Sequence, residues 1–120
     1  MSELLIVLSQ IDCVLPEMEG FLKSFDTTML QNNINIITDA DSNMYMDIPR
    51  DMPEEKVQNV KKRLEIIDRL IGTKAEEAEK LLKKGSDLES ALKKENPNQK
   101  SMILDRLEKY NKLKSSYKHL

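Results

Sequence analysis

An unbroken heptad pattern near the start of the chain limits most strongly what this sequence can fold into. Apolar residues recur there at alternating gaps of four and three residues, at Leu4, Leu8, Ile11, Leu15, Met18, Leu22, Phe25 and Met29. This spacing places all of them along one side of an α-helix. It therefore predicts a helix over about residues 2–31 that packs against another helix along its length.

Pro16 lies inside this predicted helix, where a proline removes one backbone donor and crowds the preceding turn. The heptad pattern nevertheless stays in phase on both sides of Pro16. We therefore expect one long helix kinked at Pro16, or two collinear helices of which Pro16 opens the second.

A third apolar column, spaced by seven residues, runs beside this pattern at Val7, Val14 and Phe21. The apolar face of the first helix is thus too wide for a single partner helix. We expect this helix to contact at least two others.

Two further helices are predicted, over about residues 53–95 and 97–118. The first opens at Pro53 and follows its own heptad pattern, at Val57, Val60, Leu64, Ile67, Ile71, Lys74, Ala78, Leu81, Gly85, Leu88 and Leu92. Lys74 interrupts the apolar contact, and Gly85 indicates either close helix approach or a flexible joint. Asn96, Pro97 and Gln99 suit the start of the last helix.

Composition agrees with an all-helical fold, because 33% of residues are charged, only 4% are aromatic and Trp is absent. The predicted fold class is all-α, an elongated helical bundle or antiparallel coiled coil of three long helices in a single domain, residues 1–120.

The connector, residues 32–52, contains the stretch TDADSNMYMDIP, whose Asp39, Asp41 and Asn43 match the opening spacing of an EF-hand calcium loop. Position 6 of such a loop needs Gly and position 12 needs a bidentate acid, but the chain has Met44 and Arg50 there. We therefore predict no metal site. A short β-hairpin or an irregular loop would both fit, and we favour the loop, held by Ile34, Ile36, Met44 and Ile48.

Charge is unevenly distributed along the chain. Residues 1–55 hold 11 acidic and two basic side chains, whereas residues 80–120 hold five acidic and 11 basic ones. The basic segment could bind nucleic acid or another acidic surface. We favour instead that the two parts fold against each other and neutralise.

No pattern indicates catalysis. His119 is the only histidine and has no acid or Cys cluster around it, and Cys13 has no Lys, Arg or His neighbour in sequence to activate its thiol. With three unpaired glycines the chain has no phosphate-binding loop. We expect no enzyme, catalytic residue, cofactor or small-molecule substrate.

The apolar run Leu4–Leu8 is too short for a membrane span or a signal peptide, so we expect a cytoplasmic or nuclear protein. The function we predict is a non-catalytic helical subunit, a scaffold, tether or adaptor that binds helical partner chains by heptad packing, as a homo- or hetero-oligomer. The candidate partner-binding residues are Leu5, Val7, Val14, Phe21, Tyr110 and Tyr117. The alternatives are a small chaperone that grips clients with helix tips and the Met-rich connector, and the acidic-surface binder.

Overall fold

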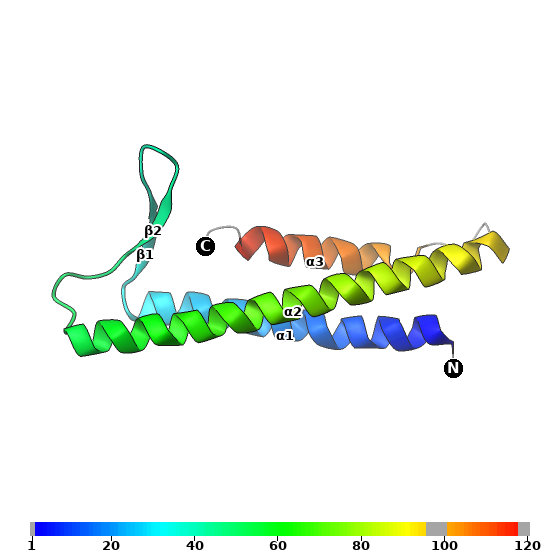
Figure 1. The fold of residues 1–120 in the computed structure, drawn as a ribbon, viewed down its shortest axis with the longest axis horizontal. Helices are drawn as coiled ribbons and strands as arrows, with labels where there is room; N and C mark the ends of the chain where they lie inside the picture. Colours follow the sequence, from blue (N-terminus) through cyan, green and yellow to red (C-terminus); the bar gives the residue numbers. More distant parts are fainter. Residues whose placement is uncertain (1, 96–100, 118–120) are drawn as a thin grey trace.

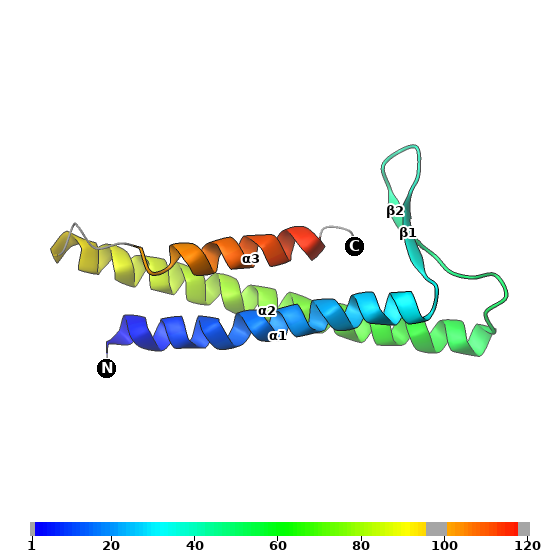
Figure 2. The same ribbon diagram turned by 180° about the vertical axis from the view of Figure 1, so that it is seen from behind.

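Three helices and two short strands make up the computed structural model, which describes residues 2–95 and 101–117. The elements are α1 (Glu3–Gln31), β1 (Asn35–Thr38), β2 (Met44–Asp47), α2 (Glu54–Glu95) and α3 (Leu104–Tyr117). The helices α1 and α2 lie antiparallel, and α3 lies against one half of this pair while the hairpin projects at the other end (Figures 1 and 2). With extents of 64 × 32 × 17 Å, the fold confirms the predicted elongated helical bundle.

The first helix begins at Ser2, whose hydroxyl oxygen accepts a hydrogen bond from the Leu5 amide at 3.2 Å, as an N-cap residue does. It then continues through Pro16 as one helix rather than as two. Its predicted heptad residues face the core, because all are buried except Leu22, which is half-buried. The helix periodicity therefore determines which face of α1 is covered.

The wide apolar face of α1 is shared between two neighbours, which confirms the expectation of two helical contacts. At the point where they meet, α2 contributes Gly85. A Cβ atom placed on Gly85 would lie 2.5 Å from Cδ1 of Ile103, the residue just before α3, and 3.4 Å from Val7 Cγ1 of α1. Of the two interpretations of Gly85, close helix approach is the one that the structure shows.

Ion pairs join the acidic and basic parts of the chain, as the charge distribution predicts. Three of them connect α1 to the other helices, Glu17–Lys74 at 2.5 Å, Asp12–Arg106 at 2.8 Å and Glu3–Lys84 at 3.5 Å. Lys74, the cation in the apolar pattern of α2, is thereby accommodated at the helix interface. The Asp12–Arg106 and Glu3–Lys84 pairs join the acidic part of the chain to the basic part, whereas Lys74 lies between the two parts in sequence.

The last helix begins at Leu104 rather than at residue 97. Residues 96–100 lie outside the described part of the chain, and Ser101–Ile103 are not helical. The Glu89 carboxylate of α2 accepts hydrogen bonds from the Met102 and Ile103 amides, at 2.5 and 3.1 Å, and from the Ser101 hydroxyl at 2.7 Å. The Ser101 hydroxyl oxygen in turn accepts from the Leu104 amide at 3.2 Å, so Ser101 and Glu89 together define the start of α3.

The connector forms a β-hairpin, so the favoured irregular loop was wrong. The Asp39 carboxylate closes the turn by accepting from the Asp41 and Asn43 amides, both at 2.9 Å, and Ser42 adopts a positive φ of 66°. The acidic stretch that resembles a calcium loop thus builds a turn. Of the four residues expected to hold the connector, Ile34 is buried and Ile36 and Ile48 are half-buried, but Met44 is exposed.

Candidate functional site

Three of the predicted partner-binding residues belong to the chain's own core. Val7, Val14 and Tyr110 are 1%, 4% and 4% exposed. These side chains belong to the chain's own hydrophobic core, and Val7 lies next to Gly85 of α2. A partner contact through these three side chains would require the bundle to open.

The other three predicted residues differ in exposure. Leu5 is 50% exposed on α1 and Phe21 is half-buried. The side chain of Tyr117 lies outside the described part of the structure. Leu5 and Phe21 are therefore accessible to a partner, and their role stays a prediction.

Tyr110 serves as a docking contact between α3 and α2. Its hydroxyl donates a hydrogen bond to Glu79 Oε1 at 2.5 Å, and Lys114 Nζ lies 3.4 Å from the same oxygen. Burial, together with this carboxylate, raises the pKa of the Tyr110 hydroxyl well above its ordinary value. The hydrogen bonds from Tyr110 and Lys114 lower the pKa of Glu79. This arrangement fixes the position of α3.

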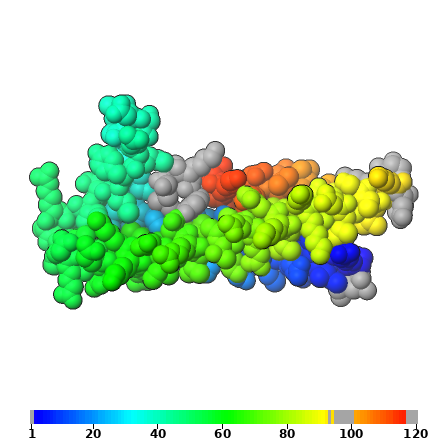
Figure 3. All heavy atoms as spheres, viewed as in Figure 1, coloured from blue at the N-terminus to red at the C-terminus, as the bar shows by residue number. Residues whose placement is uncertain are grey.

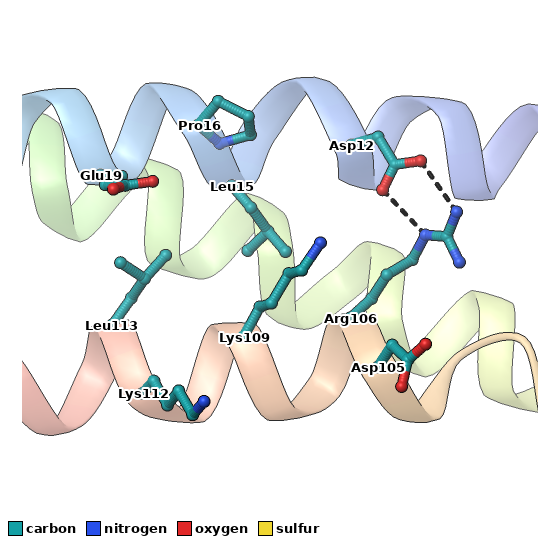
Figure 4. Close-up of a pocket in the computed structure, with 9 residues that line it drawn as sticks. All are labelled: Asp12, Leu15, Pro16, Glu19, Asp105, Arg106, Lys109, Lys112 and Leu113. Atoms are coloured by element: carbon teal, nitrogen blue, oxygen red, sulfur yellow. Dashed lines mark hydrogen bonds and ion pairs between the residues drawn. The ribbon is translucent and has the colours of Figure 1, made fainter.

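A groove of about 600 Å³ lies between α1 and α3 (Figure 4). Leu15 and Leu113 point into the space between the two helices, while Lys109 and Lys112 line its side along α3. The Arg106 guanidinium binds the Asp12 carboxylate through two hydrogen bonds of 2.8 Å, which lower the pKa of Asp12 and raise that of Arg106. This pair joins the two helices, so the groove shows helix docking rather than a reactive site.

Among the described residues, five of the 11 exposed large apolar side chains lie on or next to the β-hairpin, and the other six lie along the helices. We call Leu30, Ile37, Met44, Tyr45 and Met46 the hairpin surface; their exposed fractions run from 36% at Ile37 to 78% at Leu30. In the space-filling view the hairpin stands clear of the rod formed by the helices (Figure 3). Except for Leu30 of α1, these side chains lie on both faces of one short projecting ribbon, and exposed apolar side chains concentrated on one small element favour an interaction site.

A shallow groove accompanies the hairpin surface on the side of α1. Its volume is about 460 Å³, and its lining comes from the end of α1, the following loop and both strands: Asp26, Met29, Leu30, Ile34, Asn35, Ile36, Thr38 and Met44. The groove therefore places apolar side chains and one carboxylate next to the strands.

From the sequence, the region of the hairpin surface was named only in the chaperone alternative, as the Met-rich connector, and no site residue was assigned to it because the search followed helical columns. A usable signal was nevertheless present, since Ile36–Ile37 and Met44–Tyr45–Met46 are apolar at consecutive positions. Consecutive strand residues point to opposite faces, so a two-stranded ribbon with such runs cannot turn all of them toward a single row of helices.

Other candidate sites remain unassigned. Cys13 is exposed on α1, and His119 falls outside the described residues. Within residues 2–95 and 101–117 no group of His, Cys, Asp and Glu side chains could hold a metal ion. In the same part of the chain no helix is both long and apolar enough to cross a bilayer.

Comparison with known proteins identifies no relative, since no family model, curated protein or solved structure matches this chain. Any account of its function must therefore be argued from its own residues.

Proposed function

We propose that the chain is a non-catalytic, helical protein-interaction subunit of a larger assembly, a scaffold, tether or adaptor. The observation that carries this proposal is the hairpin surface, which gathers exposed apolar side chains at one end of a rod. Burying such side chains against a partner stabilises a complex by roughly 25 cal/mol per Å² of apolar area.

Fewer side chains are exposed for heptad packing against a partner helix than the sequence indicated. The patterned residues of α1 already pack within the chain, but Ile66 and Leu70 of α2 are 58% and 39% exposed. They are four residues apart and thus lie on one face of α2, one turn from each other. These two side chains offer a secondary helix contact on α2.

The proposal is tested by isolating the full chain from cells of its source with its bound partners. We expect partner chains to be recovered in fixed stoichiometry with the wild type. Replacing Tyr45 and Met46 by Ser should reduce that recovery by about tenfold, equivalent to ~1.4 kcal/mol. The control Lys80→Ala changes an exposed α2 residue away from the hairpin and should leave recovery unchanged.

Light scattering over a dilution series then separates two forms of assembly. A mass that falls on dilution would show self-association, whereas a constant monomer mass would assign the hairpin surface to a different chain. Equal partner recovery with the wild type and the Tyr45/Met46 variant, at unchanged helix content, would contradict the proposal.

A small chaperone is the second candidate, and the exposure of Met44 and Met46 favours it because methionine adapts to many apolar surfaces. A chaperone should suppress aggregation of an unrelated unfolded protein, and the same Ser variant should abolish that effect. A subunit of a fixed assembly should fail this assay while retaining its stoichiometric partner.

Binding to nucleic acid or another acidic surface through residues 80–120 ranks lower. Lys84, Arg106 and Lys114 of this segment each pair with a carboxylate of the same chain. If the chain retards a nucleic acid in a gel-shift assay, and if this binding weakens steeply with salt, the ranking would be reversed.

A further inference from the structure

We infer that the hairpin binds an extended segment of a partner protein that alternates basic and apolar residues, by adding it as a third β-strand. This inference rests on the proposed interaction role of the hairpin surface and specifies the partner's chemistry. It is carried by the free strand edges, the exposed side chains on both faces of the ribbon, and the local charge.

The register identifies the backbone groups that point outward. The Asp39 amide donates to the Asn43 carbonyl at 3.0 Å, and the pairs below it are Thr38–Met44, Ile37–Tyr45 and Ile36–Met46. Hydrogen-bonded and non-hydrogen-bonded pairs alternate in an antiparallel ladder. Two amides on each edge therefore point outward, away from the other strand of the hairpin. They are the amides of Ile36 and Thr38 on one edge and of Met44 and Met46 on the other.

Neither edge is occupied or protected in the described part of the chain. The two strands form a sheet of their own, and no backbone hydrogen bond joins β1 or β2 to a described residue outside the hairpin. Residues 35–47 contain no Lys, Arg or Pro, the residues that commonly block an edge. Such an edge is a template for an incoming strand.

Side chains on both faces of the hairpin would then pack against the added strand. Ile37 and Tyr45 share one face, and Ile36, Met44 and Met46 share the other, on which the groove toward α1 also lies. Apolar residues of the incoming strand would pack on these side chains at alternate positions.

The negative charge around the hairpin favours a partner segment that carries basic residues. Asp39, Asp41 and Asp47 lie on the hairpin, and Asp26 lines the groove. The last turn of α1 contains no basic residue, so the partial negative charge of its carbonyl end adds to these carboxylates. A second copy of the hairpin would bring the same acids and is disfavoured for that reason.

The test uses the full chain labelled for NMR and a short synthetic peptide of alternating lysine and valine. We expect the peptide to slow amide hydrogen exchange at Ile36 and Thr38, or at Met44 and Met46. A peptide with glutamate in place of lysine, and a lysine–valine peptide of shuffled order, should bind at least about tenfold more weakly.

Proline variants identify the edge, because Pro removes an outward amide and is tolerated at such positions of an edge strand. Thr38→Pro tests one edge and Met44→Pro the other, with Thr38→Val and Met44→Leu as controls that keep the amide. Cross-strand contacts between Ile37 and Tyr45 verify that each variant retains the hairpin. We expect one proline variant to lose peptide binding while its control retains it.

Two results would overturn strand addition: equal responses to the lysine, glutamate and shuffled peptides, or peptide binding that survives both proline variants. Neither would contradict the proposed function, which is judged separately by partner recovery with the Tyr45/Met46 variant. Loss of that recovery together with a failed peptide test would assign the hairpin surface to side-chain contacts alone.

Discussion

Gly85 of α2 lies next to Val7 of α1 and to Ile103, the residue just before α3, which makes this single residue a test of the packing. Alanine normally stabilises a helix interior by about 1 kcal/mol relative to glycine. At Gly85 the added Cβ would lie 2.5 Å from Ile103 Cδ1, so the Ile103 side chain would have to move. We expect Gly85→Ala to give no gain in the free energy of unfolding, measured by urea denaturation.

Gly72 provides the matched control, because a Cβ added there meets no atom within 4 Å. Gly72→Ala should stabilise the protein by roughly 0.5–1 kcal/mol. Equal gains at Gly72 and Gly85 would contradict tight packing at Gly85 and would show that the Ile103 side chain moves aside at little cost.

Glu89 is the second residue at which one change has a defined effect. Its side chain is 7% exposed and accepts hydrogen bonds from the start of α3. Glu89→Gln removes the charge that these donors stabilise, and we expect a loss of about 1–3 kcal/mol in unfolding free energy. Glu76→Gln changes an exposed residue of the same helix and should be neutral; a comparable loss there would contradict a specific capping role.

At the scale of elements, α3 should be the first helix to detach in acid. Hydrogen bonds from Arg106 and Tyr110 lower the pKa of Asp12 and Glu79 below their ordinary values of 3.8 and 4.5. A lowered pKa in the folded state stabilises the fold above the ordinary value, and this stabilisation is lost as the pH falls through the folded-state pKa. Docking of α3 should thus weaken progressively below about pH 4.5.

Amide hydrogen exchange between pH 6 and pH 3, corrected for intrinsic rates, measures which helix detaches first as the pH falls. Amides of α3 should lose protection at a higher pH than those in the centre of α1. In Asp12→Asn the acid sensitivity of α3 should be smaller, since one titrating partner is gone. Simultaneous loss of protection in α1 and α3 would contradict separate detachment.

The elements themselves were predictable to different degrees. The patterned residues of α1 repeat over many turns, so the helix and its buried face follow from periodicity alone. The start of α3 did not follow, because Glu89 is distant in sequence from the amides that it caps. A loop was favoured over the hairpin because the hairpin turn depends on details that composition does not show. Asp39 binds two amides and Ser42 adopts a positive φ, and many sequences rich in turn formers do neither.

At the scale of the molecule, stability should depend on the heptad layers between α1 and α2. Leu64 is 2% exposed and Ile66, two residues away, is 58% exposed. Leu64→Ala should lower the unfolding free energy by about 2–5 kcal/mol through loss of burial and creation of a cavity. Ile66→Ala should change it by less than about 0.5 kcal/mol in the isolated chain; a large effect of Ile66→Ala would reveal burial in an oligomer.

The shape of the molecule, but not its binding surface, could be inferred from the sequence. Helix lengths and antiparallel order predicted an elongated bundle, and the Cα radius of gyration is 18.8 Å, against about 14 Å for a compact domain of this length. The candidate surface on α1 was assigned differently because Val7 and Val14 are buried inside the bundle, and helix spacing alone does not state which neighbour covers a face.

The position of the hairpin has a mechanical consequence. Both α1 and α2 join the hairpin at the same end of the rod. A pull between a chain bound at the hairpin and an anchor at the opposite end would run along both helix axes, through two covalent backbones side by side. Such a load stretches the rod lengthwise and does not peel its heptad layers apart.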